Sequence, residues 1–242
     1  MIFAIMELFF ADPQNISNTE ITLDAFERKH VVQSLHKSPG EKLFVTDGQG
    51  HLYRAELISE RPAVKLKICN KQDKQKNPVT ISLAIGFIRP ARLDFVFEKC
   101  TELGVQNFYL IRTQHCNYSS ENIQRYEKIT RQAIKQSQQF FLPNIVIFQS
   151  IETFIQHTSV YDQRIAAIDA EKKPLFSQLI KIRRESASSF LYIVGPEGGF
   201  SNEECTLFQE NNFAAVSLCP NRLRAETAAI SGISTIQQYI QQ

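Results

Sequence analysis

The sequence has little of what builds disulfide frameworks or structural zinc sites. Its 242 residues include five widely spaced cysteines with no Cys-x-x-Cys pair: Cys69, Cys100, Cys116, Cys205 and Cys219. An odd number of scattered cysteines is typical of proteins from a reducing compartment. The pattern argues against a secreted disulfide-linked domain and against a metal site. We therefore expect a cytoplasmic protein that needs no metal ion.

Long apolar runs and an excess of charge are also missing. The apolar segment 1–11 has no basic start and is too short to span a bilayer, which favours a first β-strand over a signal peptide. No other segment has the length of a transmembrane helix, so no membrane partner is expected. The formal net charge of +2 neither supports nor excludes a nucleic-acid partner, because such binding needs a local basic patch.

What is present is the composition of an ordinary globular protein, with 43% hydrophobic and 21% charged residues. A chain of this length can form one large domain or two smaller ones. The polar, basic segment 70–79, which contains a proline near its end, is typical of an interdomain linker. We therefore predict two domains, covering residues 1–72 and 73–242.

The first domain has the pattern of a small β-barrel. Residues 42–57 contain two strand-like runs around Asp-Gly-Gln-Gly at 47–50, which is a hairpin signature. Residues 63–68 alternate apolar and basic side chains, as expected for a strand with one solvated face. The segment 22–41 predicts one short helix, ended by Ser-Pro-Gly at 38–40.

In the second domain, near-continuous apolar strands alternate with helices. This pattern predicts a parallel α/β sheet covered by helices on both faces. In the first of these helices, apolar residues recur at helical spacing and Gly104 follows as a helix-ending glycine. The predicted strands cover 79–87, 107–111, 145–148, 164–168, 190–194 and 214–218, and the predicted helices cover 91–103, 121–140, 174–184, 201–211 and 226–241.

Glycine is scarce, yet three of the nine glycines lie within five positions, at Gly195, Gly198 and Gly199. They follow a predicted buried strand, and ligands of open α/β sheets bind at the carboxyl ends of strands. Ser201 and Glu204 then have the spacing of a capping box. One interpretation is a loop whose backbone approaches a ligand closely, and the other is a tight turn that needs positive φ. The absence of Gly-x-Gly-x-x-Gly and of a P-loop argues against an oxidoreductase that binds a nicotinamide nucleotide, and against a nucleotide phosphate site.

A second loop follows the last predicted strand. It carries Arg222 and Arg224 directly before a helix that opens with Glu226 and Thr227. Two arginines beside a helix N-terminus can bind a phosphate or another anion. The alternative is a capped helix with solvated arginines.

Together these two loops resemble the RsmE family of ribosomal RNA methyltransferases, which are S-adenosylmethionine-dependent enzymes of the knotted SPOUT class. The resemblance rests on Val-Gly-Pro-Glu-Gly-Gly-Phe-Ser at 194–201 and on Leu-Arg-Ala-Glu-Thr-Ala at 223–228. Further segments match in family order at 6–13, 30–41, 47–50, 92–105 and 133–143. The resemblance therefore covers nearly the whole chain.

The resemblance implies a PUA-like RNA-binding β-barrel followed by a parallel α/β domain with a deep trefoil knot. It implies methylation of N3 of a specific uridine in the 16S rRNA of assembled 30S subunits, by a homodimer that binds S-adenosylmethionine. Two related alternatives stay open, namely a knotted methyltransferase that acts on tRNA and a non-catalytic RNA-binding relative.

The resemblance also implies roles for individual residues. Arg224 is expected to stabilise the uridine anion, and Glu226 is expected to accept its proton or to orient Arg224. The expected cofactor-binding residues are Gly195, Pro196, Glu197, Gly198, Gly199, Leu218, Cys219, Leu223 and Thr227. The expected RNA-binding residues are Arg28, Lys29, Lys37, Arg54, Arg92 and Lys99, whereas His30 and His36 are interpreted as ordinary helix-face residues.

The chain departs from the family pattern at a few positions. Cys219 replaces a glycine of the second loop, His36 replaces an arginine of the N-terminal helix, and Lys135 stands where many relatives have glutamate. Met6 aligns with the usual start of the family, so we interpret residues 1–5 as an extension without a functional role.

Overall fold

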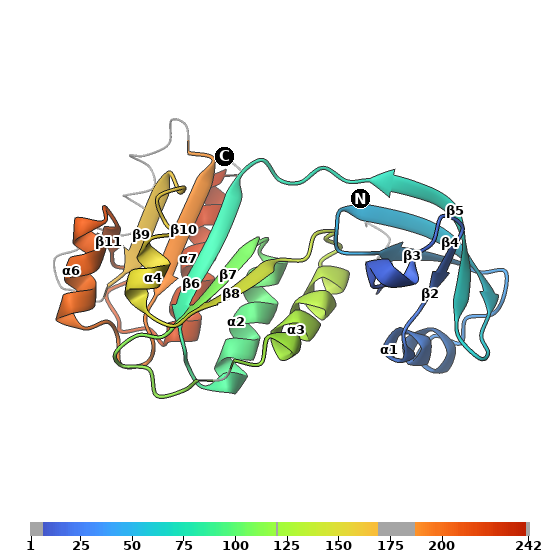
Figure 1. Cartoon of the computed structure of the whole chain (residues 1–242), viewed down its shortest axis with the longest axis horizontal. Coiled ribbons are helices and arrows are strands. Elements are labelled where there is room, and N and C mark those ends of the chain that lie inside the picture. Colours follow the sequence, from blue (N-terminus) through green and yellow to red (C-terminus); the bar gives the residue numbers. More distant parts are fainter. Residues whose placement is uncertain (1–6, 120, 169–186, 241–242) are drawn as a thin grey trace. The chain divides into compact units, whose positions relative to one another are not determined.

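The computed structural model describes residues 7–119, 121–168 and 187–240, and the chain divides into two compact units (Figure 1). The first unit combines the chain up to Lys76 with the segment Arg131–Leu142, and the second combines Asn77–Thr130 with the chain from Pro143 onward. The helix predicted over 174–184 and the extension over 1–5 lie outside the described residues.

The first unit is built on a five-stranded sheet with the strand order β1-β3-β4-β5-β2. Its strands are β1 (Leu8–Phe10), β2 (Glu20–Thr22), β3 (Lys42–Thr46), β4 (His51–Ser59) and β5 (Lys65–Asp73). β1 pairs with β3 in parallel, and the other pairings are antiparallel. The predicted hairpin is therefore confirmed as β3 and β4. Apolar side chains such as Phe9, Ile21, Val45 and Leu66 are fully buried and form the core of this unit.

The short helix predicted within 22–41 is present as two consecutive helical elements. α1 (Ala25–Arg28) continues directly as a π-helical turn, η2 (Lys29–Ser34). A short 3₁₀ helix, η1 (Pro13–Asn15), precedes them. Asp24 caps α1 by accepting a hydrogen bond from the backbone N–H of Glu27 at 2.8 Å.

Strand β5 continues into the segment that the sequence predicts to be a linker. It reaches Asp73 because β4 is nine residues long and offers a pairing partner along its length, with His51 opposite Asp73. The outer part of β5 is solvent-exposed, which explains its polar composition. The strand predicted over 63–68 from the sequence therefore ends five residues before the observed end of β5 at Asp73.

The segment Arg131–Leu142 joins the first unit through the hairpin turn between β3 and β4. Phe141 forms an isolated bridge with Gln49, and the backbone N–H of Leu142 donates to the carbonyl oxygen of Gly48 at 2.8 Å. A Cβ atom added at Gly48 would lie 2.6 Å from Cγ of Leu142. The turn glycine therefore serves two purposes, since its φ of +72° also favours glycine.

An ion pair is buried in the same unit. Nζ of Lys135 donates to Oε1 of Glu27, and the two side chains are only 5% and 3% exposed. The second carboxylate oxygen, Oε2 of Glu27, is buried without a partner among the described residues. Burial raises the pKa of Glu27, and the neighbouring Lys135 ammonium opposes this shift. Lys135, which departs from the family pattern, thus has an acceptor within its own unit.

Replacing Lys135 with methionine is expected to lower the free energy of unfolding by about 3–5 kcal/mol at neutral pH, because Glu27 is left as an uncompensated buried charge. Adding Glu27→Gln should restore much of this loss. The single variant should regain stability as the pH falls, since a carboxyl with a raised pKa binds more protons when folded. Urea unfolding at pH 8 and pH 5 checks both statements, and equal losses in the single and double variants would contradict them.

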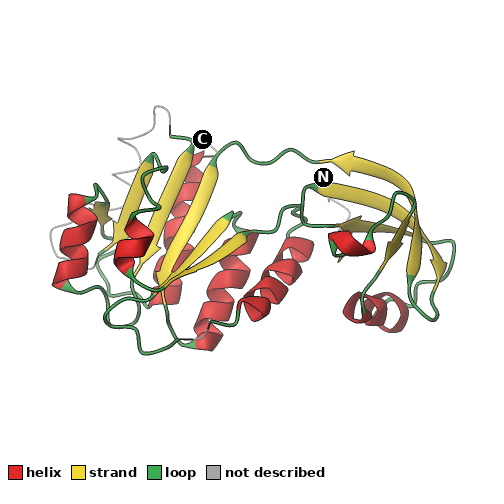
Figure 2. Ribbon diagram, viewed as in Figure 1, coloured by secondary structure: helices red, strands yellow, loops and turns green. Residues whose placement is uncertain are grey.

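The second unit is a six-stranded sheet in which all pairings are parallel, with the order β11-β9-β10-β6-β7-β8 (Figure 2). Its strands are β6 (Thr80–Gly86), β7 (Asn107–Ile111), β8 (Asn144–Phe148), β9 (Gln163–Ala167), β10 (Ser189–Val194) and β11 (Ala214–Val216). Helices α2 (Pro90–Glu102), α3 (Ile123–Gln136) and α7 (Ala225–Ile240) supply side chains to one buried cluster, and α4 (Ile151–Ile155) and α6 (Asn202–Glu210) supply the other. The predicted sheet with two covered faces is confirmed.

Two glycines fix the packing of α2 and α7 in the second unit. Gly104 ends α2 with a φ of +84°, as predicted. Gly232 lies in the middle of α7, where an added Cβ would come within 2.3 Å of the Tyr192 ring. The hydroxyl of Tyr192 donates to the carbonyl oxygen of Ala228 at 3.1 Å, which ties α7 to β10. Within the described residues, no helix has the length and apolar character needed to cross a bilayer.

Candidate functional site

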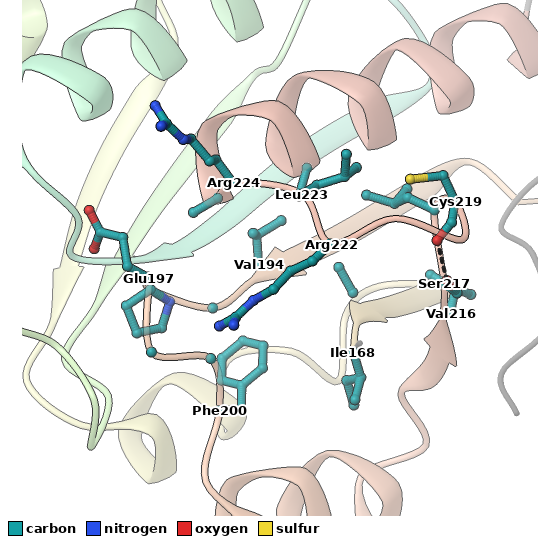
Figure 3. Close-up of a pocket in the computed structure, with 18 of the residues that line it drawn as sticks. Ile168, Val194, Glu197, Phe200, Val216, Ser217, Cys219, Arg222, Leu223 and Arg224 are labelled. Atoms are coloured by element: carbon teal, nitrogen blue, oxygen red, sulfur yellow. Dashed lines mark hydrogen bonds between the residues drawn. The ribbon is translucent and has the colours of Figure 1, made fainter. Parts of the chain in front are cut away.

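The carboxyl ends of β9, β10 and β11, which are adjacent strands of the sheet, lie beside the loops that follow β10 and β11. They enclose a pocket of about 600 Å³ (Figure 3). Its walls are apolar at Ile168, Val194, Phe200, Leu218 and Leu223, and polar groups stand among them. Because the site lies where neighbouring parallel strands end, it has the position expected of a ligand site in an open α/β sheet.

The three glycines after β10 are glycine for different physical reasons. A Cβ at Gly195 would lie 3.2 Å from the carbonyl carbon of Gly199, and a Cβ at Gly198 would lie 2.7 Å from Cβ of His115. Gly199 has a φ of +75°, and its Cβ position has no described atom within 4 Å. Glycine is therefore required at 198 by a contact within the protein, and a side chain at 195 would be tight against Gly199. At Gly199 the open space leaves room for a ligand.

Glu204 fixes the start of α6 and a neighbouring loop at the same time. Oγ of Ser201 accepts from the backbone N–H of Glu204 at 3.2 Å, and Oε2 of Glu204 accepts from the N–H of Ser201 at 2.8 Å. This confirms the predicted capping box. Oε1 of Glu204 also accepts from the backbone N–H of Gln114 at 2.8 Å. This second bond places His115 against Gly198, and no local sequence pattern signals it.

Arg92, near the start of α2, lies between two carboxylates of this site. Its Nη1 is 3.5 Å from Oε1 of Glu197, and its Nε is 3.5 Å from Oε1 of Glu226. The backbone N–H of Arg89 also donates to Oε1 of Glu197, at 3.2 Å. Arg92 therefore links α2 both to the glycine-rich loop after β10 and to the first turn of α7.

The loop between β11 and α7 contributes the positive charges. Arg222 and Arg224 both line the pocket and are exposed. In Figure 3 the Arg222 side chain reaches across the pocket toward Phe200 and the glycine-rich loop, whereas Arg224 leaves the loop in another direction. Cys219 is held within the loop, since its Sγ donates to the carbonyl oxygen of Asn221 at 3.1 Å. The sequence pattern singled out both arginines but gave no indication that Arg222 would extend into the pocket.

The structure brings most of the predicted cofactor residues together. Those that line the pocket are Gly195, Pro196, Glu197, Gly198, Gly199, Leu218, Cys219 and Leu223, and Arg224 joins them. Glu226 and Thr227 instead line a second, apolar groove between α2 and α7, together with Phe95, Lys99, Glu102, Leu103, Ile230 and Ser231. Arg92, predicted to bind RNA, lines the pocket itself.

The other predicted RNA-binding residues differ in how free their charges are. Lys37 pairs with Glu41 at 3.1 Å. Lys99 donates to Glu98 at 2.8 Å and to Glu102 at 2.9 Å, and these bonds raise its pKa. Arg28 on α1, Lys29 at the start of η2 and Arg54 on β4 have no ion-pair partner in the part of the chain that the structure describes. These three lie in the first unit and are the cations most available to a phosphate.

Across residues 7–119, 121–168 and 187–240, no group of three or more His, Cys, Asp or Glu side chains could hold a metal ion. The polar side chains that line the pocket belong to Glu197, Ser217, Asn221 and the arginines, with the thiols of Cys205 and Cys219.

Comparisons with known proteins match this chain to RNA methyltransferases. An RNA methyltransferase domain family matches residues 75–237, and an RNA methyltransferase PUA domain family matches residues 23–69. The ribosomal RNA small subunit methyltransferase E of Rickettsia conorii is 30% identical over 91% of this chain and 90% of its own length. The enzyme of the same name from Bacillus subtilis is 24% identical over 87% of this chain and 86% of its own.

Solved structures of rRNA methyltransferases also match this chain over nearly its whole length. A probable rRNA-methyltransferase from Porphyromonas gingivalis matches with a TM-score of 0.86 and 28% identity, over 97% of this chain and 98% of that one. The ribosomal RNA small subunit methyltransferase E from Neisseria gonorrhoeae, bound to S-adenosyl methionine, matches with a TM-score of 0.82 and 26% identity. That match covers 96% of this chain and 97% of the other.

Proposed function

Because the chain belongs to the ribosomal RNA small subunit methyltransferase E family, we propose that it methylates N3 of a specific uridine in 16S rRNA, with S-adenosylmethionine as the methyl donor. The observation that carries the proposal is the pocket at the carboxyl end of β9, lined by the loops after β10 and β11. It lies within the matched RNA methyltransferase domain, and a solved relative is bound to S-adenosyl methionine.

The residues of the pocket fit this cofactor. Leu218, Leu223 and Ile168 offer apolar walls to a flat adenine, and the backbone at 195–199 offers N–H and carbonyl groups to its edge. Arg222 can pair with the carboxylate of the methionine moiety. A volume of about 600 Å³ suits a ligand of this size. When bound, the cofactor supplies an electrophilic methyl group on a sulfonium sulfur.

The chain's own contribution is positioning and electrostatics. N3 of uridine is a poor nucleophile until its proton leaves, so the developing anion needs a stabilising charge. Arg224 lines the pocket directly before α7 and can supply that charge through its planar pair of donors. Glu226 is not among the residues that line the pocket; one of its oxygens lies 3.5 Å from Arg92, and the other is buried without a partner among the described residues. We therefore propose that Arg224 stabilises the uridine anion and that Glu226 orients Arg224 rather than accepting the proton.

Gly199 provides the test of the cofactor site. Asparagine tolerates the left-handed backbone that this position requires, and open space surrounds the added Cβ. Gly199→Asn should therefore keep the fold while its side chain enters the space of the ligand. We expect S-adenosylmethionine to bind at least about tenfold more weakly by calorimetry, with a melting temperature that falls only slightly because asparagine adopts positive φ more readily than other side chains.

Gly199→Val serves as the comparison, because a β-branched residue strains the same backbone conformation and should affect stability as well. If the asparagine variant bound the cofactor as the wild type does, Gly199 would serve the turn alone and the pocket assignment would be wrong. Gly198→Val is a poorer probe, since its Cβ would lie 2.7 Å from Cβ of His115 and would displace that loop.

The two predicted domains receive separate roles in this proposal. Residues 1–72, which include the match to the PUA domain, hold the rRNA of the 30S subunit, and residues 73–242 carry the reaction. The loops around the pocket would form the trefoil knot typical of the family. A substrate in the small ribosomal subunit also places the enzyme in the cytoplasm.

We further propose that the enzyme is a homodimer. Ile233 and Ile236 of α7 are fully buried in the core of their own unit, so they do not offer a surface to a partner. The apolar side chain of Ile230 on α7 instead lines the groove between α2 and α7, together with Leu103 and with Phe95, which is 46% exposed. This groove has the character of a helix-pairing surface.

Light scattering at micromolar concentration should give twice the chain mass of 27.7 kDa. Ile230→Asp should shift the mass toward that of one chain, because it places a charge in the apolar groove. Val160→Asp, at a residue that is 75% exposed elsewhere in the unit, is the matched control and should leave the mass unchanged. A wild-type mass near 27.7 kDa would contradict the dimer.

A further inference from the structure

The contacts of Arg92 assign it a role different from the phosphate contact that the sequence suggests. Its guanidinium lies between Glu197 of the glycine-rich loop and Glu226 of the first turn of α7, at 3.5 Å from each. Arg92 and Glu197 are about one quarter exposed, and Glu226 is 14% exposed. A residue that contacts phosphate needs a free cation, whereas this one is already shared by two carboxylates.

Among the described residues, Arg92 is the one ion-pair partner within 4 Å of either carboxylate, although the Arg89 guanidinium also acts on Glu197 electrostatically. Oε2 of Glu197 and Oε2 of Glu226 are both buried and have no hydrogen-bond partner among the described residues. Oε1 of Glu197 accepts one further bond, from the backbone N–H of Arg89. Burying a carboxylate is costly unless it is paired, so loss of the guanidinium would favour movement of both side chains toward water.

We propose that Arg92 is a positioning residue that sets the distance between the cofactor loop and the catalytic arginine. Through Glu197 it holds residues 195–199, whose backbone lines the pocket, and through Glu226 it holds the helical turn that directly follows Arg224. The inference rests on the proposed function, because it assumes that the pocket binds S-adenosylmethionine. It adds a residue of α2 to a site whose other described parts are the end of β9, the loops after β10 and β11, and the first turn of α7.

Positioning and phosphate binding make opposite predictions. A phosphate contact would leave cofactor affinity unchanged when Arg92 is lost, and would reduce the slope of log affinity for rRNA against log salt by roughly 0.7–0.9. A positioning residue would weaken cofactor binding and leave that slope as it is. The two measurements are independent of each other and of turnover.

The experiment uses the full-length protein and calorimetric titration with S-adenosylmethionine. Arg92→Gln is expected to bind about tenfold more weakly, and Glu197→Gln by a similar factor, because either change breaks the same contact. The double variant should be little worse than either single one. Arg92→Lys, which keeps the charge, should recover part of the affinity and guards against a fold defect in Arg92→Gln.

Arg125→Gln is the matched control. Arg125 lies on α3 and pairs with Asp94, which is on α2 as Arg92 is. Neither Arg125 nor Asp94 lines the pocket. The substitution removes one cation and one α2 ion pair, and it should leave cofactor affinity unchanged.

Wild-type affinity in Arg92→Gln, or losses in Arg92→Gln and Glu197→Gln that multiply in the double variant, would overturn the inference. A reduced salt slope for rRNA binding with unchanged cofactor affinity would assign Arg92 to phosphate instead. If the wild-type protein bound no S-adenosylmethionine at all, the proposed function would fail first, and the comparison of variants would not be reached.

Discussion

Replacing Arg224 with alanine is expected to slow methyl transfer by about 10²-fold or more at saturating S-adenosylmethionine. The residue lines the pocket and directly precedes α7, so its guanidinium can stabilise the uridine anion through two hydrogen bonds. Arg224→Lys keeps the charge but loses the planar fork, and it should also be slow. Cofactor affinity should change much less, because the adenine walls and the backbone at 195–199 are intact.

Arg222→Ala is the matched comparison, since Arg222 lies in the same loop and lines the same pocket. We expect it to weaken cofactor binding rather than turnover at saturation, because its side chain extends across the pocket (Figure 3). A wild-type rate in Arg224→Ala would contradict the assignment. So would a defect that raising the S-adenosylmethionine concentration fully recovers, because Arg224 would then be a cofactor-binding residue.

The second large effect is expected from the first unit. Exchanging Arg28, Lys29 and Arg54 for glutamine should lower the affinity for 30S subunits by roughly tenfold or more at physiological salt, since each lost phosphate contact removes counterion release. The salt dependence of binding should become flatter. S-adenosylmethionine affinity should be unchanged, and this internal control shows that the second unit is intact.

Lys37→Gln should have a smaller effect, because Lys37 is already paired with Glu41 at 3.1 Å. Unchanged 30S affinity in the triple variant would mean that these residues do not hold the RNA. Point substitutions are preferable to deleting residues 1–72, because the deletion would strip the segment Arg131–Leu142 of its partners. Lys135 would lose Glu27, and Leu142 would lose its contact with Gly48.

The parallel sheet and the site loops could be predicted because their signals are local. Buried parallel strands are continuous apolar runs, and Gly104 and the Ser201–Glu204 box mark helix ends within a few residues of sequence. The five-residue helix α4 is too short for a periodic signal, and the strand β2 has Ile21 as its one buried residue between polar neighbours, so the sequence did not reveal them.

Contacts between distant residues could not be predicted. Leu142 contacts Gly48 across more than ninety positions, and Arg92 reaches Glu197 and Glu226 across more than one hundred. These contacts are set by the chain topology, which cannot be predicted from composition or from the periodicity of apolar residues. The same holds for His115, whose contact explains why position 198 is glycine. The family motif located the pocket, but only the structure separated the glycines that pack from the one that faces open space.

The most direct test of the central claim is to map the methyl group. Purified enzyme, isotopically labelled S-adenosylmethionine and 30S subunits from a strain that lacks the enzyme are incubated, and the rRNA nucleosides are identified by mass spectrometry. The account predicts label in 3-methyluridine at a single position of 16S rRNA, with none in added tRNA. Label in tRNA, on a carbon atom of the base, or in no nucleoside at all would contradict it.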